Sequence, residues 1–144
     1  MRDVLIVTNT SDARRAPGTE RPGVWFALVQ AAVITTTFMT EYAGAGNRVV
    51  ALVEGPGLDG AGHSTVLVDR TRPAGVADLP PLPPLFHLDL TEAISRARRQ
   101  PGEEPLFVRA EYEDGTWAWR LHTGGQLREQ IRQEENRATG SRGQ

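Results

Sequence analysis

The stretch from Leu106 to Leu121, LFVRAEYEDGTWAWRL, constrains the fold of this chain more than any other. At its centre stands Asp114-Gly115. This pair favours a two-residue type I′ hairpin turn, because both residues tolerate a positive φ. The turn sets the register of the flanking strands, so Tyr112 is expected opposite Trp117. The sequence therefore predicts a β-hairpin.

The predicted register sorts the side chains of this hairpin into two faces, because side chains alternate along a strand and opposed residues share a face. The apolar face is expected to carry Leu106, Val108, Ala110, Tyr112, Trp117, Trp119 and Leu121. The polar face carries Arg109, Glu111, Glu113 and Arg120. We interpret these charges as cross-strand ion pairs on a solvated surface. A pair of carboxylates for acid–base chemistry is the alternative.

An isolated hairpin is only marginally stable in water, so its aromatic face needs a cover. The preceding segment predicts a helix from about Leu90 to Gln100, with Asp89 as N-cap and Glu92 in capping-box order. Its expected apolar stripe is Leu90, Ala93, Ile94 and Ala97. Arg96, Arg98 and Arg99 stand at its C-terminal end, where the helix dipole favours cations, and Pro101 ends it.

The remaining patterns predict one α+β or α/β domain over residues 1–137, with a mixed sheet of about five strands and a disordered tail over 138–144. Beside the hairpin, strands are expected at Val4–Val7, Arg48–Glu54 and Ser64–Arg70. A C-terminal helix is expected from about Gln126 to Arg137. The Pro-rich segment 73–85 is expected to be an extended crossover, or a seam between two halves.

The segment from Pro22 to Thr40 contains no charged residue and permits three interpretations. The preferred one is a long buried helix from about Val24 to Ala43. The second is a helix followed by a strand, because Val33–Tyr42 is rich in β-branched residues. The third is a transmembrane helix, since the run has spanning length. Gln30 and the absence of flanking basic clusters count against that third interpretation.

Composition excludes several chemistries. The chain has no Cys, which removes thiol catalysis, disulfides and thiolate metal sites. All 16 Lys and Arg residues are Arg, which removes Schiff-base lysines and the Walker lysine and is typical of a GC-rich genome. A net charge of −2 gives no electrostatic reason to expect nucleic acid as a partner. The short apolar run at the N-terminus does not resemble a signal peptide, so we expect a cytoplasmic protein.

Polar residues follow the first predicted strand, where open α/β sheets bind ligands. Asn9, Ser11 and Asp12 are candidates for holding a polar ligand, and Arg14 and Arg15 for pairing with an anion. The stretch from Gly55 to Gly60 matches the dinucleotide pattern G-x-G-x-x-G, but a strand is expected after it where that motif needs a helix. Nothing in their spacing brings His63, His87 and His122 together. We therefore expect no cofactor and no metal.

These patterns favour a non-catalytic accessory or regulatory module that binds a protein partner or associates with itself, with Trp25 as a candidate interaction residue. A small-molecule-binding or hydrolytic domain that uses the loop after the first strand is the alternative.

Overall fold

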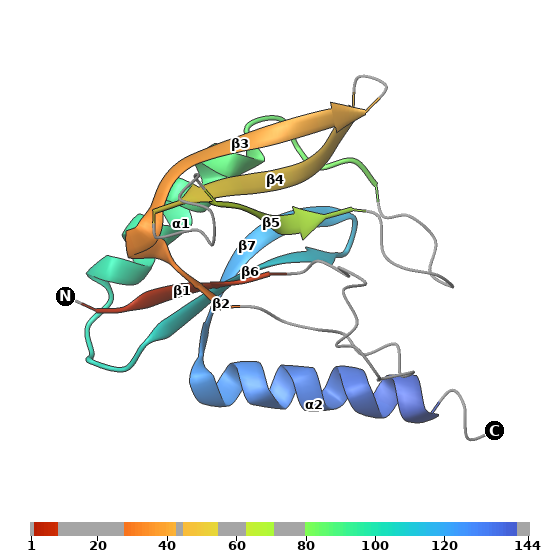
Figure 1. Ribbon diagram of the computed structural model, residues 1–144. Helices are drawn as coiled ribbons and strands as arrows, with labels where there is room; N and C mark the ends of the chain where they lie inside the picture. Colours follow the sequence, from red (N-terminus) through yellow and green to blue (C-terminus); the bar gives the residue numbers. More distant parts are fainter. Residues whose placement is uncertain (1, 9–27, 43–44, 55–62, 71–79, 141–144) are drawn as a thin grey trace, which may run out of the picture.

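The computed structural model describes residues 2–8, 28–42, 45–54, 63–70 and 80–140, and shows a mixed α+β chain (Figure 1). In order, its elements are β1 (Val4–Val7), β2 (Leu28–Gln30), the 3-10 turn η1 (Ala31–Val33), β3 (Ile34–Tyr42), β4 (Ala45–Val53), β5 (His63–Asp69), α1 (Phe86–Arg99), β6 (Leu106–Glu113), β7 (Thr116–Thr123) and α2 (Gly124–Gly140).

The first sheet contains the predicted hairpin and has the strand order β2-β1-β6-β7. Strand β1 is antiparallel to β2 and parallel to β6, so this sheet is mixed. The β6–β7 register places Tyr112 opposite Trp117 and Ala110 opposite Trp119. Asp114 and Gly115 have φ values of 52° and 81°, as the type I′ turn requires. The predicted hairpin and its register are confirmed.

The second sheet, β3-β4-β5, corrects two predictions. The five expected strands all form, but they are divided between two sheets. The long helix over Val24–Ala43 is wrong, because the described part of that segment forms β2, η1 and β3. The β-branched run from Val33 onward explains the difference, since such side chains lose rotamer freedom in a helix and pack well on a pleated surface. The strand in the second interpretation is thus confirmed, and its helix is not.

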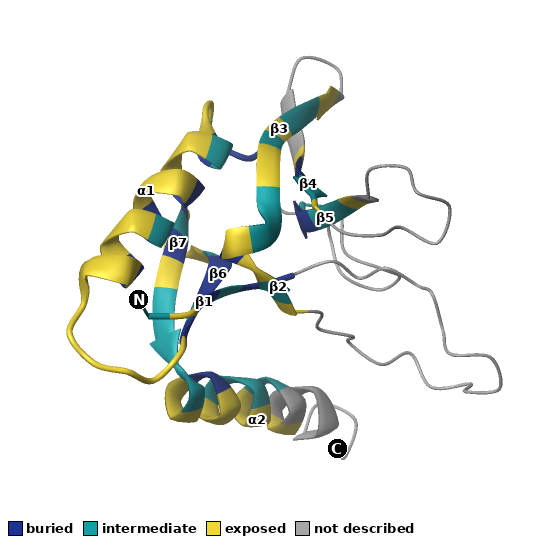
Figure 2. Ribbon diagram, turned by 60° about the vertical axis from the view of Figure 1, so that its left-hand side comes forward, coloured by how far each residue is buried: buried dark blue, intermediate teal, exposed yellow. Residues whose placement is uncertain are grey.

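One hydrophobic core of described residues joins the two sheets and α1. The first sheet contributes Ile6, Val108 and Trp119, and the second contributes Val49 and Leu67. From α1 come Phe86, Leu90, Ala93 and Ala97, so three members of the predicted stripe are buried and Ile94 packs beside them. Figure 2 shows the buried positions of α1 turned toward the sheets and its exposed positions turned outward.

Helix α1 begins four residues earlier than predicted. Leu85 occupies the N-cap position with a left-handed φ of 60°, and Asp89 lies inside the first turn and is not the N-cap. The extra turn buries Phe86, which is 1% exposed and stacks on Trp119. Packing of this ring therefore sets the start of the helix, and Asp89 acts there as a favourable charge near the positive end of the helix dipole.

Helix α2 covers the opposite face of the hairpin (Figures 1 and 2). It begins with a capping box in which the Gln126 backbone N–H donates to Thr123 Oγ1 at 3.2 Å. In return, the Thr123 N–H donates to Gln126 Oε1 at 2.9 Å. The helix buries Leu127 and ends at Gly140, beyond the predicted Arg137.

Among the described residues, neither helix combines the length and the apolar composition that crossing a bilayer requires. The transmembrane interpretation of Pro22–Thr40 also fails for its described part, which forms β2, η1 and β3.

Candidate functional site

A groove of about 1100 Å³ lies between α1 and β7, and we call it the β7 groove. Its wall on the α1 side is polar and includes Asp89, Glu92, Ser95, Arg96 and Arg99. Along the strand, the groove is lined by every residue from Trp117 to His122. It therefore follows most of the length of one strand, a shape that suits an extended chain better than a compact small molecule.

Three aromatic rings form a rigid floor at one end of this groove. Trp119 stacks on Phe86 with ring centroids 4.9 Å apart, and Trp117 meets Phe86 edge-on at 6.1 Å. Trp119 Nε1 donates to the Phe86 carbonyl at 2.9 Å, and Trp117 Nε1 donates to the Pro80 carbonyl at 3.0 Å. Because both indole N–H groups have partners, the rings are held in place before any ligand arrives.

The backbone of β7 is available along the groove, since β7 is the last strand in its sheet. Next to a two-residue turn, the opposed pair Glu113 and Thr116 exchanges hydrogen bonds, and every second pair after it does the same. The amide and carbonyl groups of Trp117, Trp119 and Leu121 consequently point away from β6. The N–H of Thr123 follows the same alternation, and Gln126 accepts its hydrogen bond.

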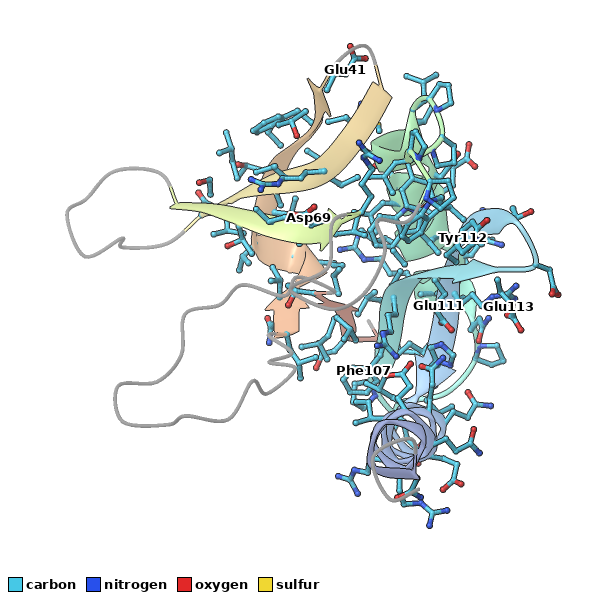
Figure 3. All side chains as sticks on the ribbon, turned by 90° about the vertical axis from the view of Figure 1, so that its right-hand side faces the viewer. Glu41, Asp69, Phe107, Glu111, Tyr112 and Glu113 are labelled. Atoms are coloured by element: carbon cyan, nitrogen blue, oxygen red, sulfur yellow. The ribbon has the colours of Figure 1, made fainter. Side chains whose placement is uncertain are left out.

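The structure places a second polar cluster between the hairpin and α2. The Arg109 side chain is 4% exposed, and its guanidinium donates to Glu134 Oε1 at 3.0 Å, to Glu134 Oε2 at 3.1 Å and to Gln130 at 3.0 Å. Glu111 lies 2.6 Å from His122 Nε2 and accepts from Gln130. Figure 3 shows Phe107 and Glu111 on the α2 side of β6 and Tyr112 on the other side. The prediction that this face is solvated is wrong for Arg109 and Glu111, because α2 covers them.

Within this cluster, Glu111 is held as a carboxylate. Burial raises its pKa, but hydrogen bonds from His122 and Gln130 and the charges of His122 and Arg109 outweigh burial, so the pKa lies below its usual value. Glu113 is 60% exposed and pairs with Arg120 at 3.5 Å, as the ion-pair interpretation predicted. The two carboxylates thus serve separate ion pairs, and this arrangement gives no support to the alternative of a shared acid–base pair.

The candidates predicted for ligand binding lie elsewhere in the chain. Asn9, Ser11, Asp12, Arg14 and Arg15 are outside the described residues, and so is Trp25. The glycine pattern Gly55–Gly60 is also outside them, and the element that follows is strand β5, as predicted. Across the ranges that the structure describes, no group of three or more His, Asp and Glu side chains is arranged for a metal ion.

Sequence reasoning did not identify the β7 groove, although its parts were visible. The helix before the hairpin and the aromatic face of the hairpin were both predicted. The sequence did not indicate, however, which of the two hairpin strands pairs with β1. Because β6 takes that position, β7 is left at the edge. Of the groove residues on α1, Asp89 and Glu92 were interpreted only as a capping pair. Arg96 and Arg99 were interpreted only as cations that stabilise the C-terminal end of the helix dipole.

No family model matches this chain, and neither the curated proteins nor the solved structures contain a significant match to it.

Proposed function

We propose that this protein is a non-catalytic accessory or regulatory module that binds a partner protein. In this proposal an extended segment of the partner pairs with β7 as a fifth strand of the first sheet. The observation that carries it is an edge strand with outward backbone groups at Trp117, Trp119 and Leu121, set along a groove of strand length. A cytoplasmic location, expected from the sequence, is part of the same proposal.

Proteins rarely leave an edge of this kind bare, because unpaired N–H and C=O groups are a template for further strands. The common protections are Pro residues, covering loops and bulges. Strand β7 has no Pro, its pairing with β6 is regular, and no described strand pairs with its outer edge. Addition of a peptide strand to a sheet edge is a recurrent binding mode, in which main-chain hydrogen bonds give affinity and side-chain pockets give selectivity.

The test begins with a selection of random peptides of about eight residues, the length of β7, against the folded protein. Amide hydrogen exchange is then followed with the strongest binder. We expect new protection at Trp119 and Leu121, whose N–H groups point outward. Ala118 and Arg120 should change little because β6 already accepts their hydrogen bonds.

Two variants of α1 complete the test. Ser95 lines the groove, so Ser95→Trp should block binding. Arg98 is exposed on the same helix but lines a different hollow beside Arg2, so Arg98→Trp should bind normally. Protection at residues away from β7, or equal effects of the two variants, would overturn the proposal.

A further inference from the structure

The charges along the β7 groove are segregated by position. Asp89 and Glu92 come from the N-terminal half of α1, and Arg96 and Arg99 come from its C-terminal half. The N-terminal end of α1 lies against the first half of β7, since the Phe86 carbonyl accepts from Trp119 and the Phe86 ring meets Trp117 edge-on. The groove is therefore acidic near the start of β7.

The other end of α1 lies near the end of β7. Arg2 donates to the carbonyl oxygen of Gln100, just after α1, and the neighbouring Asp3 carbonyl accepts from the Leu106 N–H. Leu106 is opposite Thr123, the last residue of β7. The arginines at the C-terminal end of α1 thus flank the end of β7, and the groove is basic there.

Arg96 and Arg99 contribute few interactions to the fold. Arg96 and Arg99 are exposed and form no ion pair within the described part of the chain. The backbone carbonyls of Gln100 and Pro101, which directly follow α1, accept hydrogen bonds from the Arg2 guanidinium and so do not need these arginines. Arg120 on β7 adds a third positive charge to the same groove, and among the described residues its ion-pair partner is the exposed Glu113. On a chain with a net charge of −2, this is a local concentration of positive charge.

A second copy of the chain fits this edge poorly. Antiparallel pairing of β7 with itself, centred on Arg120 or on Leu121, would place Arg120 of one copy opposite Arg120 or His122 of the other. Directly opposed like charges destabilise a strand pair. A segment that carries carboxylates would instead complement the basic end and avoid the acidic end.

We infer that the β7 groove takes an antiparallel peptide whose amino-terminal half is acidic and lies between Arg96, Arg99 and Arg120. This inference rests on the proposed strand addition and specifies its partner. Antiparallel pairing is chosen because it is the more stable ladder. In that direction the amino-terminal half of the peptide meets the end of β7, and its carboxyl-terminal half meets Asp89 and Glu92.

The test uses synthetic peptides of Val and Thr, as long as β7, that differ only in where charge is placed. One has Glu at three positions in its amino-terminal half, one has Gln there, and one has the three Glu in its carboxyl-terminal half. The first should bind at least about tenfold more tightly than either of the others, because several partly exposed charge pairs act together. Its affinity should fall as NaCl rises from about 0.05 to 0.5 M, and that of the Gln peptide should not.

Charge reversal on α1 provides the matched comparison. Arg96→Glu and Arg99→Glu should each weaken the Glu peptide about fivefold or more and leave the Gln peptide unchanged. Arg98→Glu makes the same charge change outside the groove and should affect neither peptide.

The outcomes separate this inference from the proposed function. Equal binding of all three peptides, with protection at Trp119 and Leu121, would overturn the acidic partner and leave strand addition standing. Failure of these peptides and of the random library to protect β7 would overturn both. A concentration-dependent dimer that protects the same amides without peptide would make a second copy the occupant, and would overturn the acidic partner alone.

Discussion

Replacement of Trp119 tests the packing that supports the β7 groove. This side chain is 5% exposed, stacks on Phe86 with planes 21° apart and donates one hydrogen bond to the Phe86 carbonyl. Truncation to Ala would remove the indole from a core that the two sheets share with α1. A substitution at this position therefore tests the central contact between helix and hairpin.

The size of the effect follows from these contacts. Truncation of a buried Trp costs about 3–5 kcal/mol. The upper part of this range applies here, because a stacked aromatic pair adds about 0.5–1.5 kcal/mol and the indole hydrogen bond about 1 kcal/mol. Trp119→Phe keeps an aromatic ring against Phe86 but loses the hydrogen bond and some volume, so about 1–2 kcal/mol is expected. Since a domain has only about 5–15 kcal/mol of stability in total, the Ala variant should be close to unfolding.

The assay is urea denaturation followed by far-UV circular dichroism, which does not depend on the replaced fluorophore. Leu88→Ala on the same helix is the control, because Leu88 is 48% exposed and should change the unfolding free energy by no more than about 0.5 kcal/mol. A loss below about 1.5 kcal/mol for Trp119→Ala would contradict the position of this ring in the core. Equal losses for the Phe and Ala variants would refute the assigned role of the stacked ring.

Two further predictions concern the hairpin. The folded state lowers the pKa of Glu111, so its carboxylate contributes stability above its unfolded pKa of about 4.3, and this stability is lost as pH falls through the folded value. The difference in unfolding free energy between wild type and Glu111→Gln should therefore narrow as the pH falls from about 5 toward 3 in urea titrations, and a difference that stays the same over that range would contradict the prediction. Gly115 has a φ of 81°, and the space where a Cβ would lie is open. Gly115→Ala should therefore lower the unfolding free energy by about 1–2 kcal/mol through backbone strain alone. A melting temperature equal to that of the wild type would argue against the type I′ turn.

The local parts of this fold were predictable from local chemistry. Asp114-Gly115 specifies a turn, the turn specifies a register, and alternation then assigns each side chain to a face, with no information from the rest of the chain. The apolar stripe of α1 was predictable for the same reason, since its period depends only on helix geometry. The strands β1, β4 and β5 were also found from their composition.

Where local sequence signals disagreed, contacts with distant parts of the chain determined the secondary structure. The charge-free stretch after Pro22 has Ala residues that favour a helix and β-branched residues that favour a strand. Pairing of β3 with β4, from Ile34 to Tyr42, resolves that conflict in favour of the strand. The start of α1 was likewise set by the contact of Phe86 with Trp119, which lies far along the chain.

The hairpin, its two faces and the helix that covers one of them could be predicted from neighbouring residues alone, because turns and periodicity act over short distances along the chain. The pairing of β1 with β6, the position of α2 over Arg109 and Glu111, and the place of β7 at the edge beside α1 depend on contacts between distant segments. An edge exists only after every strand has found its partner, and those partners come from opposite ends of the chain.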